Sequence, residues 1–281
     1  MTEMILSEQL DLFVADIIDA VPKGELSTME YPIFAISTRP DPKPYRFENP
    51  KTGAWMEILP SSKGRATIHD KDILLYCFGQ LAEAANRGRQ VSRKVHMVAY
   101  DFLKQTNRGT GGREYRAITD ALVRLRGTTF NTNVRDGSQL AQKGSVFGLI
   151  DYGQAVTDNS GRLTHVEVVI SEHLFAALNN KQILTYNPEY FMLSTGYERR
   201  LYELCRKHCG NQNSWEIGFK NLHNKFGVRS SLREFRRKIK ELVVKQSIPD
   251  YYIHLLEKNG PDTIEKLIVK RKTSKNYISE S

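Results

Sequence analysis

The chain has 281 residues, of which 40% are hydrophobic and 26% charged, and its formal net charge at pH 7 is +9. Its apolar runs fall short of the ~20 residues that cross a bilayer, and no basic segment precedes the first apolar residues, so we expect neither a membrane span nor a secretion signal. The three cysteines, Cys77, Cys205 and Cys209, suit a reducing cytoplasm, and the positive charge favours a polyanionic partner.

The charge is unevenly distributed along the chain. Residues 1–30 contain seven acids and a single base, Lys23. Residues 86–126 hold ten Lys or Arg against three acids, and residues 197–246 hold thirteen against five. Charge that only keeps a surface solvated would be scattered, so these clusters indicate two polyanion-binding segments behind a short acidic leader that we expect to be mobile.

The first basic segment lies within a series of predicted helices and strands. Residues 31–69 read as an irregular lead-in with one hairpin, which we expect to extend the sheet of the first domain. A long helix, a short helix with Tyr100 and Leu103, a glycine-rich turn and a second long helix follow. The predicted hairpin strands are 45–48 and 55–59, the long helices are 71–88 and 111–127, and the later strands are 128–134, 145–150 and 164–170.

The second basic segment lies within a similar series. Asn187 and Pro188 are typical of a helix start and predict a helix over residues 189–210. A short helix that ends at Gly227 and a basic helix over residues 231–246 come next. The strands predicted after them are 251–257 and 264–270, on either side of Asn259-Gly260-Pro261.

The two basic helices begin with nearly the same four residues. Arg113-Glu114-Tyr115-Arg116 recurs as Arg233-Glu234-Phe235-Arg236. In each helix the apolar residues recur at steps of three and four, which predicts one buried stripe, and most basic residues fall outside it. An arginine on such a face can bind a phosphate or a guanine edge through two hydrogen bonds.

These basic residues are the candidate DNA-binding residues. The second helix has the denser set and is expected to carry most of the specific affinity, whereas the first is expected to position the DNA backbone. Residues 187–281 alone are therefore expected to keep most of the sequence preference. The candidates are Arg233, Arg236, Arg237 and Lys240 in the second helix and Arg113, Arg116 and Arg124 in the first, with Arg87, Arg89, Arg93 and Lys94 as an extension of the first patch.

Helix, short helix, tight turn, basic helix and β-hairpin is the order of a winged helix, in which the second helix of the helix-turn-helix enters the major groove. The sequence therefore predicts an α+β fold with two tandem winged-helix domains. The expected segments are the leader at 1–30, the first domain at 31–186 and the second at 187–281, with a boundary near residues 180–187.

The stretch YDFLKQTNRGTGGREYRAITDALVRLRGTTFNTN, followed by YERRLYELCRKHCG, resembles the replication initiator protein A family. The similarity extends over residues 30–272 and includes order and spacing. These proteins are plasmid Rep proteins, related to the tandem winged-helix initiators of iteron-type plasmids.

The resemblance implies a function for the whole chain. Such initiators bind repeated double-stranded origin DNA, help to open the origin and recruit the host initiator and helicase machinery. The second domain makes the main repeat contacts, and the first contacts neighbouring DNA and forms the interface of a homodimer in equilibrium with the monomer. We therefore expect a bacterial, plasmid-encoded, cytoplasmic protein.

The acidic leader contains a separate motif, Gln9-Leu10-Asp11-Leu12-Phe13. It resembles the peptide by which many bacterial proteins dock onto the replicative sliding clamp. In that interpretation Leu12 and Phe13 fill an apolar pocket, Leu10 packs beside them and Gln9 anchors the peptide through hydrogen bonds. The alternative is an amphipathic helix with Leu6, Leu10, Phe13 and Ile17 packed on the first domain.

A winged-helix transcriptional repressor would use the same groove contacts and stays open as an alternative. A nicking or priming enzyme is disfavoured, because Arg108–Gly112 lacks the lysine of a phosphate-binding loop and no His-x-His occurs. Cys205, His208 and Cys209 share a helical face but lack a fourth zinc ligand. We expect no enzymatic activity, no metal and no cofactor.

Overall fold

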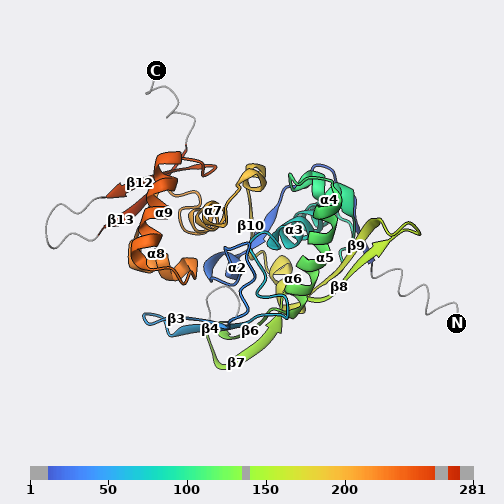
Figure 1. The fold of residues 1–281 in the computed structure, drawn as a ribbon, viewed down its shortest axis with the longest axis horizontal. Helices are drawn as coiled ribbons and strands as arrows, with labels where there is room; N and C mark the ends of the chain where they lie inside the picture. Colours follow the sequence, from blue (N-terminus) through green and yellow to red (C-terminus); the bar gives the residue numbers. More distant parts are fainter. Residues whose placement is uncertain (1–11, 135–139, 257–264, 273–281) are drawn as a thin grey trace, which may run out of the picture.

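The computed structural model describes residues 12–134, 140–256 and 265–272. Two α+β units follow one another along the chain and lie at opposite ends of the molecule (Figure 1). None of the helices in these residues is long and apolar enough to cross a membrane.

The second unit packs three helices against a small antiparallel sheet. Its sheet order is β11-β13-β12, so the last strand lies between the other two. Capping boxes at Thr195 and Ser231 begin α7 and α9, and Gly227 ends α8 in the left-handed conformation at φ 64°. The elements are α7 (Gly196–His208), β11 (Ser214–Gly218), α8 (Phe219–Phe226), α9 (Leu232–Lys245), β12 (Tyr251–Leu256) and β13 (Lys266–Arg271).

The first unit repeats this topology. Its sheet order is β1-β5-β9-β8, in which β5, β9 and β8 correspond to β11, β13 and β12. Its α5 packs on β8 and its α4 on β9. The elements are β1 (Leu12–Ala15), α3 (Lys71–Asn86), β5 (Lys94–Val98), α4 (Ala99–Gln105), α5 (Gly112–Gly127), β8 (Ile150–Thr157) and β9 (Leu163–Ile170).

The sequence repeat therefore reaches beyond the two basic helices. The first residues of β5 and β11, of α4 and α8, and of α5 and α9 are each 120 residues apart (214 − 94, 219 − 99 and 232 − 112). The strands β5 and β11 were not predicted, because each contains only five residues directly before a helix. A strand–helix–helix segment, rather than a helix alone, occurs twice.

A second sheet interrupts the first unit. The predicted hairpin became β3 and β4, which pair with β6 and β7 in the order β3-β4-β6-β7. The strands that directly follow the first basic helix, β6 and β7, therefore do not form the hairpin of the first unit. That hairpin consists of β8 and β9, on either side of the turn at Ser160-Gly161. The strands are β3 (Tyr45–Asn49), β4 (Ala54–Leu59), β6 (Thr129–Val134) and β7 (Leu140–Gly148).

The expectation of a mobile acidic leader is wrong for its described part. β1 pairs in parallel with β5, and Phe13, only 3% exposed, belongs to the core of the first unit. The side chain of Gln80 hydrogen-bonds both the amide and the carbonyl of Ile17. β2 (Lys23–Glu25) then pairs with β10 (Ile183–Thr185) and leads into α2 (Leu26–Glu30).

This arrangement also corrects the clamp-docking interpretation. Phe13 cannot fill a partner's pocket while its ring is buried in the sheet, and neighbouring Leu12 is a strand residue in the same ladder. Of the helical alternative, the packing of Phe13 and Ile17 on the first domain is confirmed, but the helix is wrong at Phe13, where the backbone is extended. Gln9 and Leu10 lie outside the described residues.

The two units have separate hydrophobic cores that divide between Leu178 and Tyr186. The division falls in the segment where the domain boundary is predicted, between α6 (Glu172–Asn179) and η1 (Pro188–Met192). The second core also contains Met29 and Leu75 from the first part of the chain. A fragment of residues 187–281 would therefore lack part of the hydrophobic core of the second unit.

Buried ion pairs join the two units. Lys71 at the start of α3 contacts Glu203 of α7 at 2.6 Å, and both side chains are 1% exposed. Arg199 of α7 contacts Asp72 of α3, also at 2.6 Å. Since an unpaired buried charge is costly, these contacts hold α3 and α7 in one relative position.

Candidate nucleic-acid interface

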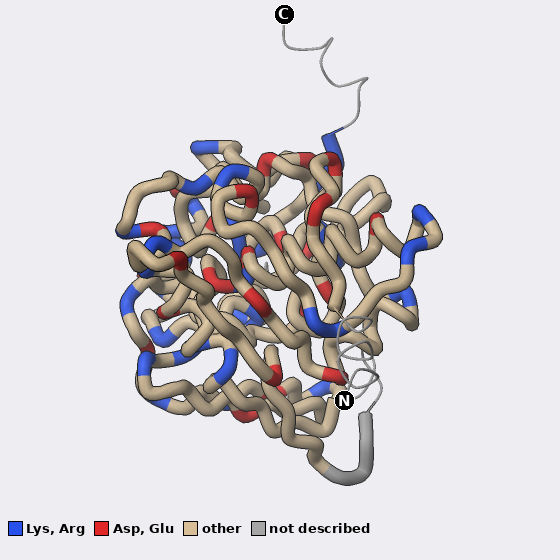
Figure 2. Tube along the Cα trace, turned by 90° about the vertical axis from the view of Figure 1, so that its right-hand side faces the viewer, with Lys and Arg blue, Asp and Glu red and all other residues tan. Residues whose placement is uncertain are grey.

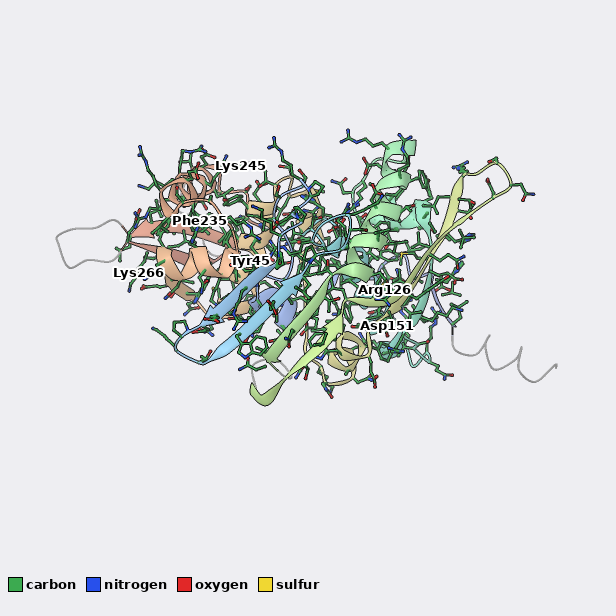
Figure 3. All side chains as sticks on the ribbon, turned by 60° about the horizontal axis from the view of Figure 1, so that its bottom comes forward. Tyr45, Arg126, Asp151, Phe235, Lys245 and Lys266 are labelled. Atoms are coloured by element: carbon green, nitrogen blue, oxygen red, sulfur yellow. The ribbon has the colours of Figure 1, made fainter. Side chains whose placement is uncertain are left out.

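Helix α9 presents its basic residues on one open face. Its buried stripe is Phe235, Ile239 and Leu242, which pack into the second core. Figure 3 labels Phe235 and Lys245 on this helix. The four residues predicted for specific DNA contacts are all exposed and line one groove of about 760 Å³; they are Arg233, Arg236, Arg237 and Lys240.

Two carboxylates lie among these cations. Glu265, beside β13, contacts Arg236 at 3.0 Å and Lys240 at 3.7 Å, and Glu241 contacts Arg237 one turn away on the helix. No ion pair of Arg233 is present within the described part of the chain. The groove keeps a surplus of positive charge, because four cations and two carboxylates line it.

Helix α5 presents a sparser basic face. Its buried stripe is Ile118, Ala121, Leu122 and Leu125. Arg113 and Arg116 are exposed, as predicted for backbone contacts, and Arg113 also lines a cleft of about 460 Å³ that reaches the second unit. Asp120 on the same helix pairs with Lys63. The first helix therefore carries fewer basic residues than α9, although Arg113, Arg116 and Arg126 form no ion pair within the described residues.

Arg124 does not belong to this exposed face, which corrects its assignment to phosphate binding. Its guanidinium donates two hydrogen bonds of 2.7 Å to the carboxylate of Asp70, which is 5% exposed. These hydrogen bonds raise the pKa of Arg124. Arg124 anchors α5 to the start of α3 through a bidentate contact made by its Nε and Nη2.

The proposed extension of the patch is also largely compensated. Arg87 and Arg89 pair with Asp19 and Asp16 of the leader, and Arg93 pairs with Asp151, each at 2.7–2.8 Å. Lys94 lies in β5 between β1 and β9 and is half-buried. The acidic leader thus neutralises the basic residues that follow α3 instead of staying apart from the domain.

Three residues of the two faces were missed. Val244 lines the α9 groove and is 86% exposed. It follows Lys240 by one helical turn, so helical spacing could have predicted that it lies on the same face. Glu265 could not be found, because only folding brings β13 to α9. Arg126, exposed at the end of α5 and labelled in Figure 3, is the third.

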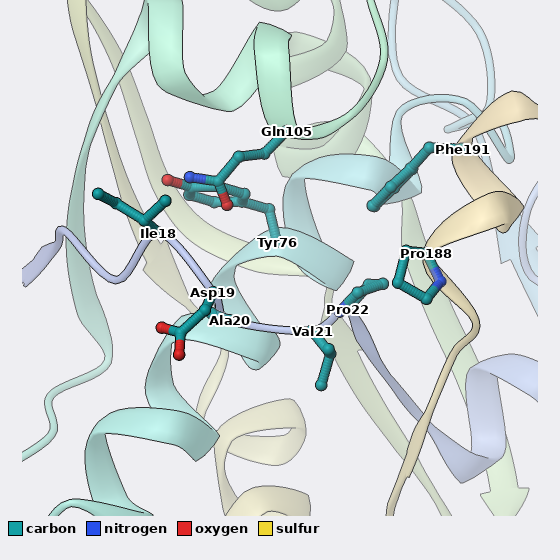
Figure 4. A pocket seen from close by; sticks show the side chains of 9 residues that line it. All are labelled: Ile18, Asp19, Ala20, Val21, Pro22, Tyr76, Gln105, Pro188 and Phe191. Atoms are coloured by element: carbon teal, nitrogen blue, oxygen red, sulfur yellow. The ribbon is translucent and has the colours of Figure 1, made fainter.

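Figure 2 shows Lys and Arg positions on several sides of the molecule, many of them at its periphery, and several Asp and Glu positions farther inside. A smaller hollow of about 250 Å³ lies between the leader and η1, where Ile18 and Pro22 approach Tyr76 and Phe191 (Figure 4). Its lining residues include no Lys or Arg, so it does not belong to the basic faces.

The cysteines and histidines do not come together as metal ligands. Cys205 and Cys209 are buried free thiols, and His208 contacts Glu30 at 2.8 Å and stacks on Trp215. Among the residues that the structure describes, no group of three or more His, Cys, Asp or Glu side chains could hold a metal ion.

The chain contains two copies of one strand–helix–helix–hairpin unit, and the second helix of each copy carries basic residues. These features define the class as two-unit proteins with basic helical faces. The family model described as Replication initiator protein A matches residues 23–253. The chain belongs to the replication initiator protein A family.

Individual relatives agree with that family. A curated protein of Wigglesworthia glossinidia brevipalpis with the description "Putative replication protein" is 36% identical over 250 residues, which cover 86% of this chain and 88% of that protein. Among solved structures, domains 2 and 3 of RctB align with a TM-score of 0.61 at 16% identity, over 86% of this chain and 95% of that one. A second structure of these RctB domains gives a TM-score of 0.57 at 14% identity, over 85% of this chain and 95% of that one. At such identities the RctB structures show a shared fold alone.

Proposed function

We propose that this replication initiator works as a plasmid initiator by binding repeated double-stranded origin DNA, with its two units acting as winged helices and α9 entering the major groove. The groove lined by Arg233, Arg236, Arg237 and Lys240 is the observation that carries the proposal. Arginine forks in such a groove suit guanine edges and phosphates, and the exposed methyls of Val244 suit a thymine methyl.

The first unit adds backbone contacts in this proposal. Arg113, Arg116 and Arg126 supply positive charge along α5, but Asp120 and the pairing of Arg124 reduce it. A contact to phosphate carries no sequence information by itself, so α5 lengthens the footprint without much discrimination. Origin opening, recruitment of the host initiator and helicase, and a monomer–dimer equilibrium complete the proposed role, which requires no catalytic step by this chain.

A fourfold alanine variant of Arg233, Arg236, Arg237 and Lys240 tests the DNA-binding step. Its matched control replaces four exposed bases elsewhere, Lys43, Lys51, Arg162 and Lys181, and so removes the same charge. Footprinting on the DNA beside the coding region should show loss of protection for the first variant only. Side chains at base edges should each contribute ~1–3 kcal/mol, and each lost phosphate contact should flatten the salt dependence by about one unit of slope. Normal protection by the folded α9 variant would refute the proposal.

A transcriptional repressor is the alternative, because the same face could bind an operator. The arrangement of the protected DNA separates the two functions. Directly repeated sites beside an AT-rich segment support initiation, whereas a lone inverted repeat over a promoter supports repression.

A further inference from the structure

A pocket of about 450 Å³ lies where the first unit meets the turn between α8 and α9. One wall comes from residues 35–41 with Arg65, and the other comes from Tyr197 and the turn itself. The two units approach each other closely at Gly227, because a Cβ there would lie only 2.3 Å from the Cβ of Pro32. The volume falls within the range of small-molecule sites, about 300–1,000 Å³.

Arg65 is the unusual residue of this pocket. It is 3% exposed, yet its Nε is buried without a hydrogen-bond partner in the described residues. Its other nitrogens make only long contacts, 3.5 Å to the carbonyl of Pro32 and 3.7 Å to the carboxylate of Asp41. A guanidinium stays charged even when burial lowers its pKa, so Arg65 is a buried cation with unused donors.

Apart from Asp41, the charged side chains that line the pocket with Arg65 are cations. The guanidinium carbons of Arg65 and Arg229 lie 5.0 Å and 5.8 Å from the ring centre of Tyr45, which Figure 3 labels. Arg229 shares the single carboxylate of Asp41, at 3.6 Å, and Arg39 also lines the pocket. Three guanidiniums thus face one carboxylate.

A hydroxyl group completes the set of donors. The Oγ of Ser230 is buried and also lacks a hydrogen-bond partner in the described part of the chain. Ser230 directly precedes the N-cap of α9 and lines the pocket together with Arg229. Residues from both units with unused donors therefore line one pocket, and a multiply charged anion with several acceptor oxygens would satisfy them.

We propose that this pocket binds the phosphate group of a small phosphorylated molecule, held by Arg65, Arg229 and Ser230. A phosphate offers enough oxygens to accept from both arginines and the serine, which one carboxylate does not. Because Arg65 is nearly inaccessible, a free small molecule reaches it more readily than a phosphate within the DNA backbone. The bound molecule would connect the first unit to the turn before α9, next to the proposed DNA-binding helix.

Calorimetric titration of the full-length protein with ATP, inorganic phosphate and acetate at equal ionic strength tests this site. ATP and phosphate should bind and acetate should not. Arg229→Gln, a change at a half-exposed residue, should weaken ATP binding at least about tenfold, since a hydrogen bond to a charged group is worth ~1.5–3 kcal/mol. Arg65→Gln should do the same if it folds, and the exposed control Arg162→Gln should not.

Asp41→Asn gives the opposite prediction. Asp41 is the only carboxylate among the described residues that line the pocket, so its removal should make ATP binding several-fold tighter. Absence of ATP and phosphate binding in the wild type would show that Arg65 is a structural cation. Binding that is unchanged in Arg229→Gln and Arg65→Gln would place the anion elsewhere. Weakened binding of a non-specific duplex by Arg229→Gln, without any ATP binding, would assign the pocket to DNA phosphate; each of these outcomes overturns the proposal.

Discussion

Arg116 and Arg124 lie about two turns apart on α5, and their surroundings give them different roles. Arg116 is exposed to solvent, whereas Arg124 donates to both carboxylate oxygens of Asp70 from its Nε and Nη2. A charge-assisted bidentate pair with a buried carboxylate stabilises the fold, and an exposed arginine contributes little to stability. The same residue type therefore serves folding at one position and is free for phosphate at the other.

Arg124→Ala should lower the free energy of unfolding by about 1.5–3 kcal/mol, because it leaves the Asp70 carboxylate without its partner. Arg116→Ala should leave stability unchanged and reduce the salt dependence of DNA binding. Urea denaturation and salt titrations of DNA binding measure the two effects. Equal stability of both variants would return Arg124 to the DNA-binding face.

Phe13→Ala tests the leader in the same way. Removal of a ring that is 3% exposed should destabilise the protein by about 3–5 kcal/mol. Ile18→Ala is the control in the same segment, since Ile18 is 88% exposed and should be neutral. A stable Phe13→Ala variant in thermal and urea unfolding would mean that the leader is not packed as β1.

At the scale of elements, a carboxylate links the start of α7 to the end of α9. Glu198 belongs to the capping box of α7 and also accepts hydrogen bonds from Lys245 and Ser247, at 2.6 Å and 2.7 Å. Burial by itself would raise the pKa of Glu198, but hydrogen bonds from Lys245, Ser247 and Thr195 lower it to about 2. The position of the proposed DNA-binding helix therefore depends on this carboxylate being ionised.

This dependence predicts a stability change in acid. The folded-state pKa of Glu198 lies below its usual value of 4.5, so its contribution is present above pH 5 and is lost as the pH falls toward 2. The unfolding free energy of the wild type should fall more steeply over that interval than that of Glu198→Gln. If urea titrations at several pH values gave the same pH dependence of the unfolding free energy for both proteins, ionisation of Glu198 would not contribute to stability.

At the scale of the whole molecule, the two units are joined by buried charges as well as by apolar contacts. Glu203 receives hydrogen bonds from Lys71, Arg200, Tyr186 and Tyr190, and it is 1% exposed. Burial is the largest influence on Lys71 and lowers its pKa. The network therefore depends on the one carboxylate at its centre.

The network predicts an asymmetry between its two ends. Glu203→Gln leaves two buried cations, Lys71 and Arg200, without their carboxylate and should cost about 3–5 kcal/mol. Lys71→Met should cost less, because Glu203 keeps Arg200 and two tyrosines. Urea denaturation at neutral pH compares the variants, and a larger loss for Lys71→Met would contradict the central role of Glu203.

The sequence by itself determined the two basic helices, their buried stripes and the four bases of the α9 groove. Helical periodicity is local, so Phe235 and Ile239 indicate the buried face of α9, and Arg233, Arg236, Arg237 and Lys240 outside it are exposed. The 120-residue repeat is likewise visible in the letters, and the structure extends it to the preceding strands.

Only the tertiary structure decided which strands and charges meet. β6 and β7 pair with β3 and β4, although the chain order suggested a hairpin on α5, because strand pairing depends on partners far away in sequence. Phe13 is a core residue and Arg124 anchors α5 to α3 for the same reason. The leader is far along the chain from β5, with which it pairs, and Asp70 is far along the chain from Arg124. Whether a charged side chain is free to bind a ligand or is neutralised within the fold depends on its neighbours in space. The sequence pattern does not contain those neighbours.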